Sequence, residues 1–510
     1  MKQLLLLFTT IFLTSGIWSQ GLIAKEITKD RAAGKFGKVQ NIFTASRTFA
    51  PVKGIKAAHY FGMMPVTVGK SAYLAMNVPT YGNLYLKQVQ SDTRILTSKG
   101  TMIMPVIAHY RGTDAAGNLA AISITNGEVM GLISTAQGNI NISKSGAQHV
   151  IFNDKDLAKK DTFHCDTRQL PRTLHRAAVS SIPGNHCVTW YWETDYDIFV
   201  QKGSAEAVST YILGVFNQVQ TLYANDGITV KLGTLKINTV QDSYTGPGTG
   251  NFLDQFGAQV SAHPFTEDFG TLIGYNGGGG IAWVNSYCNE IQYRCAYCGI
   301  GSSYSGVPTF SWTIEVMTHE NGHLLGCNHT HDPVWTVNGI PNTRIDSCGD
   351  AAGYCSHAPC PTPPISLPIS GGTIMSYCHL TSAGINFNKG FGPQPRDLMQ
   401  ARIFTVSCLG TCDTIVTPPP PPGICPVGYH KDTINVRIDS TNSGVKVIST
   451  GGTNYKYVWS KNGVKQSWAT QVIRKGYYAS RDVLKVVVSS SNKPTIQHCY
   501  IPGSAKIIIK

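Results

Sequence analysis

Three histidines and a glutamate between residues 319 and 329 are the residues of this sequence best suited to chemistry. The run reads His-Glu-Asn-Gly-His-Leu-Leu-Gly-Cys-Asn-His, so His319 and His323 are four residues apart and share one face of a helix. Glu320 follows the first histidine and points toward the same space. Two imidazoles at this spacing are typical zinc ligands, and the adjacent carboxylate can take a proton from a metal-bound water.

A glycine then allows a third ligand to approach. Gly326 tolerates backbone angles that other residues resist, so the chain can leave the helix and bring in His329. His331 is a rival for that position, but the spacing favours His329, and we interpret His331 and Asp332 as residues that orient the ligands or the loop. Three protein ligands leave one position for water, as in catalytic zinc sites. The competing interpretation is three ordinary histidines on a solvated or buried helix.

A second motif, Gly-Gly-Thr-Ile-Met-Ser-Tyr-Cys at residues 371–378, follows downstream. Together the two motifs resemble those of the metzincin zinc metalloendopeptidases, and most closely the bacterial adamalysin/reprolysin-like members. This resemblance implies that Met375 forms an apolar floor under the histidines, although Met375 alone reads as a core residue. It also implies that Tyr377 can hydrogen-bond a developing oxyanion, as in astacin-like members. The alternative for Tyr377 is a purely structural role.

The resemblance covers Cys187 to Cys412 more weakly and implies an α+β catalytic domain, with a mixed twisted sheet above a smaller, disulfide-tied part. Periodicity predicts helices over 204–224 and 312–326, and a last helix over 395–406. A strand is expected over 188–192. By resemblance, a further strand is the edge that pairs with an extended substrate. Its residues are Gly280, Ile281, Ala282 and Trp283.

Composition divides the chain into five parts. Residues 1–20 have the positive start and apolar run of a signal peptide, which predicts a secreted, extracellular protein. We expect a β-rich propeptide over 21–180, the catalytic domain over 181–412 and a proline-rich linker over 413–424. Residues 425–510 alternate apolar and polar positions, which predicts a small β-sandwich serving as an accessory or sorting module.

Cys165 is the only cysteine of the expected propeptide. One hypothesis is that its thiolate occupies the open zinc position before activation, which would make the protein a zymogen. The other is a disulfide, perhaps with Cys187. Arg172 and Arg176 are candidate cleavage points between the propeptide and the catalytic domain.

The other cysteines are expected to form disulfides, since an exported chain oxidises them. One group is expected to tie the segment between the two motifs, with Cys327 as a candidate member: Cys348, Cys355, Cys360 and Cys378. Another is expected to form a local loop framework: Cys288, Cys295 and Cys298.

The predicted function is zinc-dependent hydrolysis of internal peptide bonds in extracellular proteins, with one catalytic Zn²⁺ and Glu320 as general base. Calcium stays open, because no ordered ligand set is present. The segment 423–510 has 13 Lys/Arg and 3 Asp/Glu, a surplus of 10 positive charges within a total of +13. This surplus favours contact with acidic polysaccharide or a cell surface, or simply a basic β domain. We expect no nucleic-acid partner and no membrane span. The alternative function is a surface-binding or adhesion protein whose protease domain is inactive or secondary.

Overall fold

The computed structural model divides into two compact units, Met1–Ile415 and Val416–Lys510. In the first it describes residues 21–43, 48–49, 59–61, 72–125, 127–145, 148–156, 164–170, 186–301, 310–354, 367–406 and 408–410. In the second it describes 430–433, 435–441, 444–450, 455–462, 464–466, 471–474, 483–490, 498–501 and 503–508. The expected signal peptide and both candidate cleavage arginines lie outside these ranges. Among the described residues, no helix combines the length and apolar character needed to cross a membrane.

A seven-stranded mixed sheet forms the framework of the catalytic half, in the order β12-β16-β17-β15-β13-β14-β6. Only the β16–β17 pair is antiparallel. The strands are β6 (Arg94–Thr97), β12 (His164–Arg168), β13 (Val188–Thr194), β14 (Val230–Ile237), β15 (Phe269–Gly274), β16 (Gly279–Trp283) and β17 (Cys295–Gly299). Both outermost strands, β6 and β12, come from the N-terminal part of the chain.

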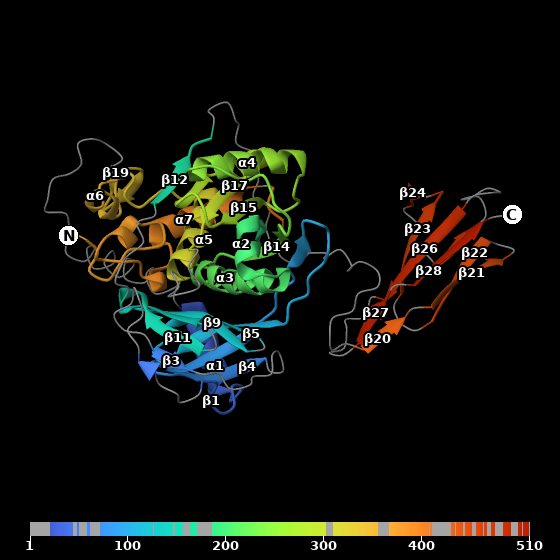
Figure 1. The fold of residues 1–510 in the computed structure, drawn as a ribbon, viewed down its shortest axis with the longest axis horizontal. Coiled ribbons are helices and arrows are strands. Elements are labelled where there is room, and N and C mark those ends of the chain that lie inside the picture. The colour runs from blue at the N-terminus through green and yellow to red at the C-terminus, as the bar shows by residue number, and fades with distance from the viewer. Residues whose placement is uncertain are drawn as a thin grey trace, which may run out of the picture. The chain divides into compact units, whose positions relative to one another are not determined.

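Helices cover both faces of this sheet (Figure 1). α4 (Thr249–Ala262) packs on one face, and α3 (Ala205–Asn225) and α5 (Phe310–Leu324) pack on the other. α3 begins at Ser204, whose hydroxyl accepts a hydrogen bond from the Ala207 amide, and it ends at Asp226. The predicted helices over 204–224 and 312–326 are thus confirmed, whereas α4 was not expected.

Between the sheet strands and the long helices the chain is irregular. Its short elements are α2 (Tyr196–Lys202), α6 (Cys348–Ala351), α7 (Pro393–Thr405), β18 (Trp335–Val337), β19 (Ile340–Thr343) and the 3₁₀ turns η2 (Ile291–Tyr293), η3 (Tyr377–Leu380) and η4 (Phe387–Lys389). α7 begins two residues before the predicted start at Pro395, because a proline is also present at its first position.

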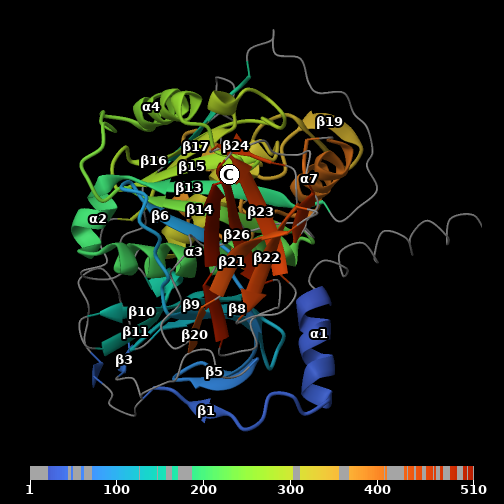
Figure 2. The same ribbon diagram turned by 90° about the vertical axis from the view of Figure 1, so that its right-hand side faces the viewer.

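The N-terminal segment, residues 21–170, folds into a ten-stranded sheet, in the order β1-β4-β5-β7-β8-β9-β10-β11-β3-β2. Its elements are α1 (Gly21–Ala32), β1 (Gln40–Asn41), β2 (Thr48–Phe49), β3 (His59–Phe61), β4 (Tyr73–Val78), β5 (Gly82–Val89), β7 (Ile107–Asp114), β8 (Leu119–Thr125), β9 (Glu128–Thr135), β10 (Gly138–Ser145), β11 (Gln148–Asn153) and η1 (Asp154–Asp156). The layers run from α4 through the catalytic sheet and α3 to this N-terminal sheet (Figures 1 and 2).

The second unit consists of strands, as the alternating pattern predicts. They form sheets of two (β20-β27), three (β21-β22-β25) and four strands (β24-β23-β26-β28). The strands are β20 (His430–Thr433), β21 (Asn435–Thr441), β22 (Gly444–Thr450), β23 (Tyr455–Lys461), β24 (Val464–Lys465), β25 (Val472–Arg474), β26 (Val483–Ser490), β27 (His498–Ile501) and β28 (Gly503–Ile508).

Candidate metal centre

The second half of α5 presents His319 and His323 to the space under the sheet. The helix ends at Leu324, and Gly326 follows with φ of 100°, a conformation that favours glycine. A side chain at this position would also overlap the guanidinium of Arg402, which donates a hydrogen bond to the Gly326 carbonyl (2.7 Å). The chain therefore turns away from the helix axis, and His329 comes back to face the two helical histidines.

The three histidines converge through their Nε2 atoms. His323 Nε2 lies 3.0 Å from His319 Nε2 and 3.2 Å from His329 Nε2, and all three side chains are buried. Nitrogens bound to one zinc ion at 2.0–2.1 Å in tetrahedral geometry lie about 3.3 Å apart. The spacing of the nitrogens therefore suits a zinc ion.

The protonation of His319 and His323 also favours a bound cation. His319 Nδ1 faces the carbonyl of Ile374 (2.8 Å), and His323 Nδ1 faces the carbonyl of Cys327 (2.6 Å). Burial lowers the pKa of both rings, so each is neutral and uses its one proton in the bond to the carbonyl. The Nε2 lone pairs then face each other at 3.0 Å, an arrangement that a cation between them would relieve.

Glu320 is fully buried beside this centre. By distance and angle, neither of its carboxyl oxygens accepts a hydrogen bond from the described residues. Burial raises the pKa of this carboxyl group well above its usual value, and the neighbouring Cys165 thiol partly offsets that rise. Its carboxyl group lies against Gly280 of β16, where a side chain would overlap Glu320 Oε1. A buried carboxylate without a partner is costly unless water or a cation completes its surroundings. This position suits a group that holds a water molecule and moves its proton.

Met375 and His331 both lie close to the histidine-bearing segment. Met375 is fully buried, and its sulfur lies 2.9 Å from where a side chain on Gly322 would begin, so the helix approaches it closely. His331 is not part of the convergent set. Its ring stacks on His329 with centroids 5.0 Å apart, and Asp332 accepts a hydrogen bond from the His329 amide (3.0 Å).

Tyr377 lies edge-on to the His329 ring, with centroids 4.7 Å apart. Its side chain is 3% exposed, and its hydroxyl donates a hydrogen bond to the carbonyl of Cys165. The tyrosine thus faces the centre, but its hydroxyl is engaged by the N-terminal segment.

That segment covers the expected substrate edge. β12 pairs in parallel with β16, with Cys165 opposite Gly280 and Arg168 opposite Trp283. The thiol of Cys165 is free and buried, and it lies within 4.8 Å of ligand atoms of His319 and Glu320. The alternative disulfide with Cys187 is wrong, because Cys165 is free while Cys187 is bonded elsewhere.

Several other cysteine predictions are wrong. Cys348 pairs with Cys378, as one of the expected bonds, but Cys327 is free. Cys288 pairs with Cys408, 120 residues away, and not within a local loop framework. Residues three apart on a strand point to opposite faces, so Cys295 packs toward α4 and Cys298 toward α5, and both are free. Cys355 and Cys360 lie outside the described residues.

Asp226, the residue that follows α3, supports the centre from a distance. Its carboxylate accepts a hydrogen bond from the Phe391 amide (2.8 Å), and the neighbouring Gly390 carbonyl accepts one from Ile374. The carbonyl of Ile374 in turn accepts the hydrogen bond from His319 Nδ1 that orients the imidazole ring. Sequence spacing contains no signal for this connection. Gly280 was also missed as a close contact of Glu320, although the glycine run before it was a visible signal.

Comparison with known proteins agrees with this centre. Residues 185–386 match the model of metallopeptidase family M12. Among solved structures, the chain is similar to metalloproteinase-II from Bacteroides fragilis, with 12% identity, a TM-score of 0.32, and coverage of 58% of this chain and 90% of that one. No match was found among curated protein sequences. Residues 185–386 therefore form a metzincin-like zinc metalloendopeptidase domain of family M12.

Proposed function

We propose that this chain is a secreted endopeptidase, made as a latent precursor, that cleaves internal peptide bonds of extracellular proteins. The observation that carries the proposal is the convergence of three neutral histidines next to a buried carboxylate without a hydrogen-bond partner. His319, His323 and His329 hold the zinc ion in this proposal. When bound, zinc supplies a Lewis acid that polarises the scissile carbonyl and acidifies a water molecule.

The protein's own groups then handle the proton. The carboxylate of Glu320 takes a proton from the attacking water and returns it to the amide nitrogen that leaves. Gly280 leaves room for this carboxylate next to the sheet edge. Tyr377 becomes free to donate its hydroxyl to the oxyanion once the carbonyl of Cys165 has been removed.

The edge strand β16 supplies the substrate-binding surface. Gly280, Ile281, Ala282 and Trp283 offer backbone groups along an edge that β12 now occupies. An extended peptide would replace β12 and pair with the same backbone groups, as in other cases of strand addition. Substrate and β12 therefore exclude each other.

Latency in this proposal has two parts, blockage of the edge by β12 and occupation of the open metal position by Cys165. The free, buried thiol next to His319 and Glu320 supports the second part. Burial raises the pKa of this thiol, whereas a bound zinc ion would favour the thiolate. Cleavage near Arg172 or Arg176 would break the peptide chain between the N-terminal segment and the protease domain.

The proposal that the protein is secreted rests on the signal-peptide pattern of residues 1–20. The positive charge of segment 423–510 supports contact with acidic polysaccharide or an anionic cell surface. Amino-terminal sequencing of exported protein would test the first point. Loss of binding to a sulfated polysaccharide after deletion of 425–510 would test the second. If deletion instead traps the protein inside the cell, the module serves export.

The central test compares the processed enzyme with Glu320→Gln on a denatured protein substrate, with zinc measured in both. We expect about one zinc per chain in each, and a loss of activity of at least about 100-fold in Glu320→Gln. A wild-type chain that holds zinc but cleaves none of the substrates offered would favour the alternative, a surface-binding protein. A wild-type chain without zinc would refute the site assignment.

A further inference from the structure

The N-terminal segment contacts the catalytic domain at a second surface, away from the metal centre. α3 lies between the catalytic sheet and the N-terminal sheet, and 16 of its 21 residues are buried (Figure 1). We call the docking surface the part of α3 formed by Gly214, Asn217 and Gln220 together with the β14 edge, Thr234–Ile237.

A polar network crosses the docking surface. The partly exposed side chain of Arg111 in β7 donates hydrogen bonds from its guanidinium to Asn217 Oδ1 (3.1 Å) and to Gln220. Asn217 Nδ2 donates in return to the carbonyl of Ile122 in β8 (3.1 Å). Such hydrogen bonds make the contact specific, because a mismatched partner would leave a desolvated donor or acceptor unsatisfied.

An apolar contact fits beside this network. Met130 of β9 packs against Gly214, so closely that a side chain there would overlap its sulfur. Several side chains of the N-terminal segment are buried in the same apolar cluster as the catalytic core. They are Ile95, Ile103, Leu119, Met130 and Leu132. The segment therefore shares a core with the enzyme in addition to covering its cleft.

The third contact is a strand. β6 pairs in parallel with β14, with Arg94 opposite Thr234 and Thr97 opposite Ile237. The Ser98 amide continues the pairing to the Ile237 carbonyl (2.8 Å). β6 thus lies at the opposite edge of the seven-stranded sheet from β12.

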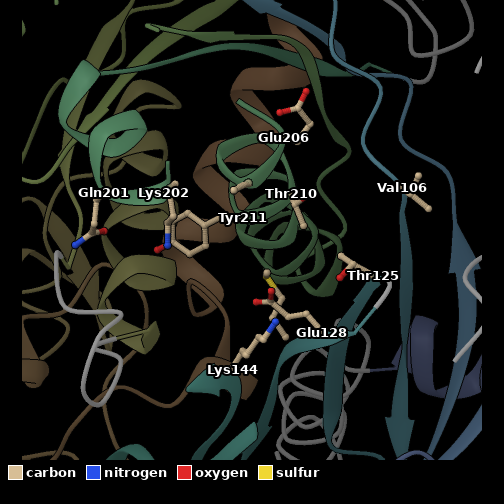
Figure 3. Close-up of a pocket in the computed structure, with 11 residues that line it drawn as sticks. Val106, Thr125, Glu128, Lys144, Gln201, Lys202, Glu206, Thr210 and Tyr211 are labelled. Atoms are coloured by element: carbon tan, nitrogen blue, oxygen red, sulfur yellow. The ribbon is translucent and has the colours of Figure 1, made fainter. Parts of the chain in front are cut away.

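A cavity of about 770 Å³ bounds the docking surface near the start of α3 (Figure 3). Glu128 and Lys144 line it from the N-terminal sheet, and Lys202 and Tyr211 line it from the catalytic side. The Lys202 ammonium lies 3.9 Å above the Tyr211 ring and attracts Glu128 across the space. Packing is loose here, so the close contacts concentrate on Gly214, Asn217 and the β14 edge.

We propose that the docking surface keeps the N-terminal segment bound after the chain is cut, so that cleavage alone yields a non-covalent, inhibited complex. The partner of this surface is the cut segment of the same chain, and activation requires its removal or destruction in a second step. The inhibition rests on the proposed function, whereas the binding does not.

The test uses the full chain with a specific protease site placed between Arg172 and Arg176. After the cut, size-exclusion chromatography at decreasing concentration follows the two fragments, and hydrolysis of a reporter peptide follows activity. We expect the wild-type fragments to co-elute and activity to stay low. The Gly214→Ala fragments should separate at a roughly 10-fold higher concentration, because the added methyl group overpacks against Met130.

The melting temperature of Gly214→Ala and two further variants distinguish weakened docking from a general folding defect. Alanine is the better helix former, so Gly214→Ala should raise the melting temperature of the freed catalytic fragment while weakening the complex. Gly214→Ala combined with Met130→Ala should restore retention. Gly257→Ala in α4, where the nearest neighbour of an added Cβ is Gln292, should leave retention unchanged.

Wild-type fragments that separate on cutting would overturn the proposal. So would retention by Gly214→Ala equal to that of the wild type, because the cleft alone would then hold the segment. Co-elution is measured without activity, so a protein that never hydrolyses the reporter counts against the proposed function and leaves this test intact.

Discussion

Replacing Gly280 with alanine tests whether Glu320 must stay where the structure places it. The new Cβ would overlap Glu320 Oε1 and lie 2.5 Å from Cδ, where ordinary contacts begin at 3.4 Å. The carboxyl group, or the strand that carries residue 280, must therefore retreat by about 1 Å. The histidine ligands lie on α5 and the following turn, and the three atoms nearest to the new Cβ all belong to Glu320.

A displacement of about 1 Å costs a catalytic group roughly 100-fold in rate. This corresponds to about 2.7 kcal/mol, because each tenfold is 1.36 kcal/mol. We therefore expect kcat/KM of processed Gly280→Ala to fall by about two orders of magnitude, with zinc content unchanged. The assay is hydrolysis of a fluorogenic peptide, beside metal analysis of the same samples.

Gly248→Ala is the matched control, since no atom lies within 4 Å of a side chain added there. It should retain activity within about twofold. If Gly280→Ala keeps wild-type activity and zinc, Glu320 does not need this position, and its assignment as the base loses its geometric support. If zinc is lost as well, the reasoning about separate ligand and base positions is wrong.

Three further predictions concern the latent form and stability. In the uncut chain, Cys165 should resist alkylation until zinc is chelated, and Cys165→Ser should raise basal peptide hydrolysis; rapid alkylation of the metal-loaded chain would contradict the thiol's role. Loss of the Cys348–Cys378 bond, which closes a loop of 30 residues, should destabilise the processed enzyme by about 3.5 kcal/mol, measured by denaturant unfolding of the double serine variant; an unchanged midpoint would contradict it. Burial raises the pKa of Asp226 from 3.8 to about 7, so the folded state binds the proton more tightly and this group's contribution to stability declines as pH rises from about 4 to 7. Asp226→Asn should therefore raise the melting temperature relative to wild type at pH 8, by an amount equivalent to ~4 kcal/mol at most, and the gain should shrink toward pH 4; a pH-independent difference would refute the ionisation argument.

Local patterns predicted the elements that carry the centre. The apolar spacing of 204–224 matched α3 because that face packs on the sheet, and Gly326 marked the end of α5 because its φ is positive. The expected positions of His319 and His323 follow from helix geometry alone. The sequence did not predict α4, because Gly248 provides no side-chain cap for the helix and Gly257 interrupts its apolar periodicity.

Such local patterns could not predict which distant strands or cysteines pair with each other. Nothing near Arg94–Thr97 shows that it joins a strand about 140 residues away, since parallel partners are chosen by the whole sheet. The Cys288–Cys408 bond is likewise set by tertiary packing and not by spacing. Cys295 and Cys298 were misread because the two-residue gap suggested a loop, whereas both lie on β17.

The positions of β6 and β12 have a consequence for solubility. An open sheet edge presents unpaired amides and carbonyls that can recruit strands from other chains. Here both ends of the catalytic sheet terminate in short strands of the N-terminal segment, four and five residues long. Strands β14 and β16, which are eight and five residues long, are therefore shielded for as long as that segment stays in place. Self-association through these edges is thus prevented while the N-terminal segment covers them.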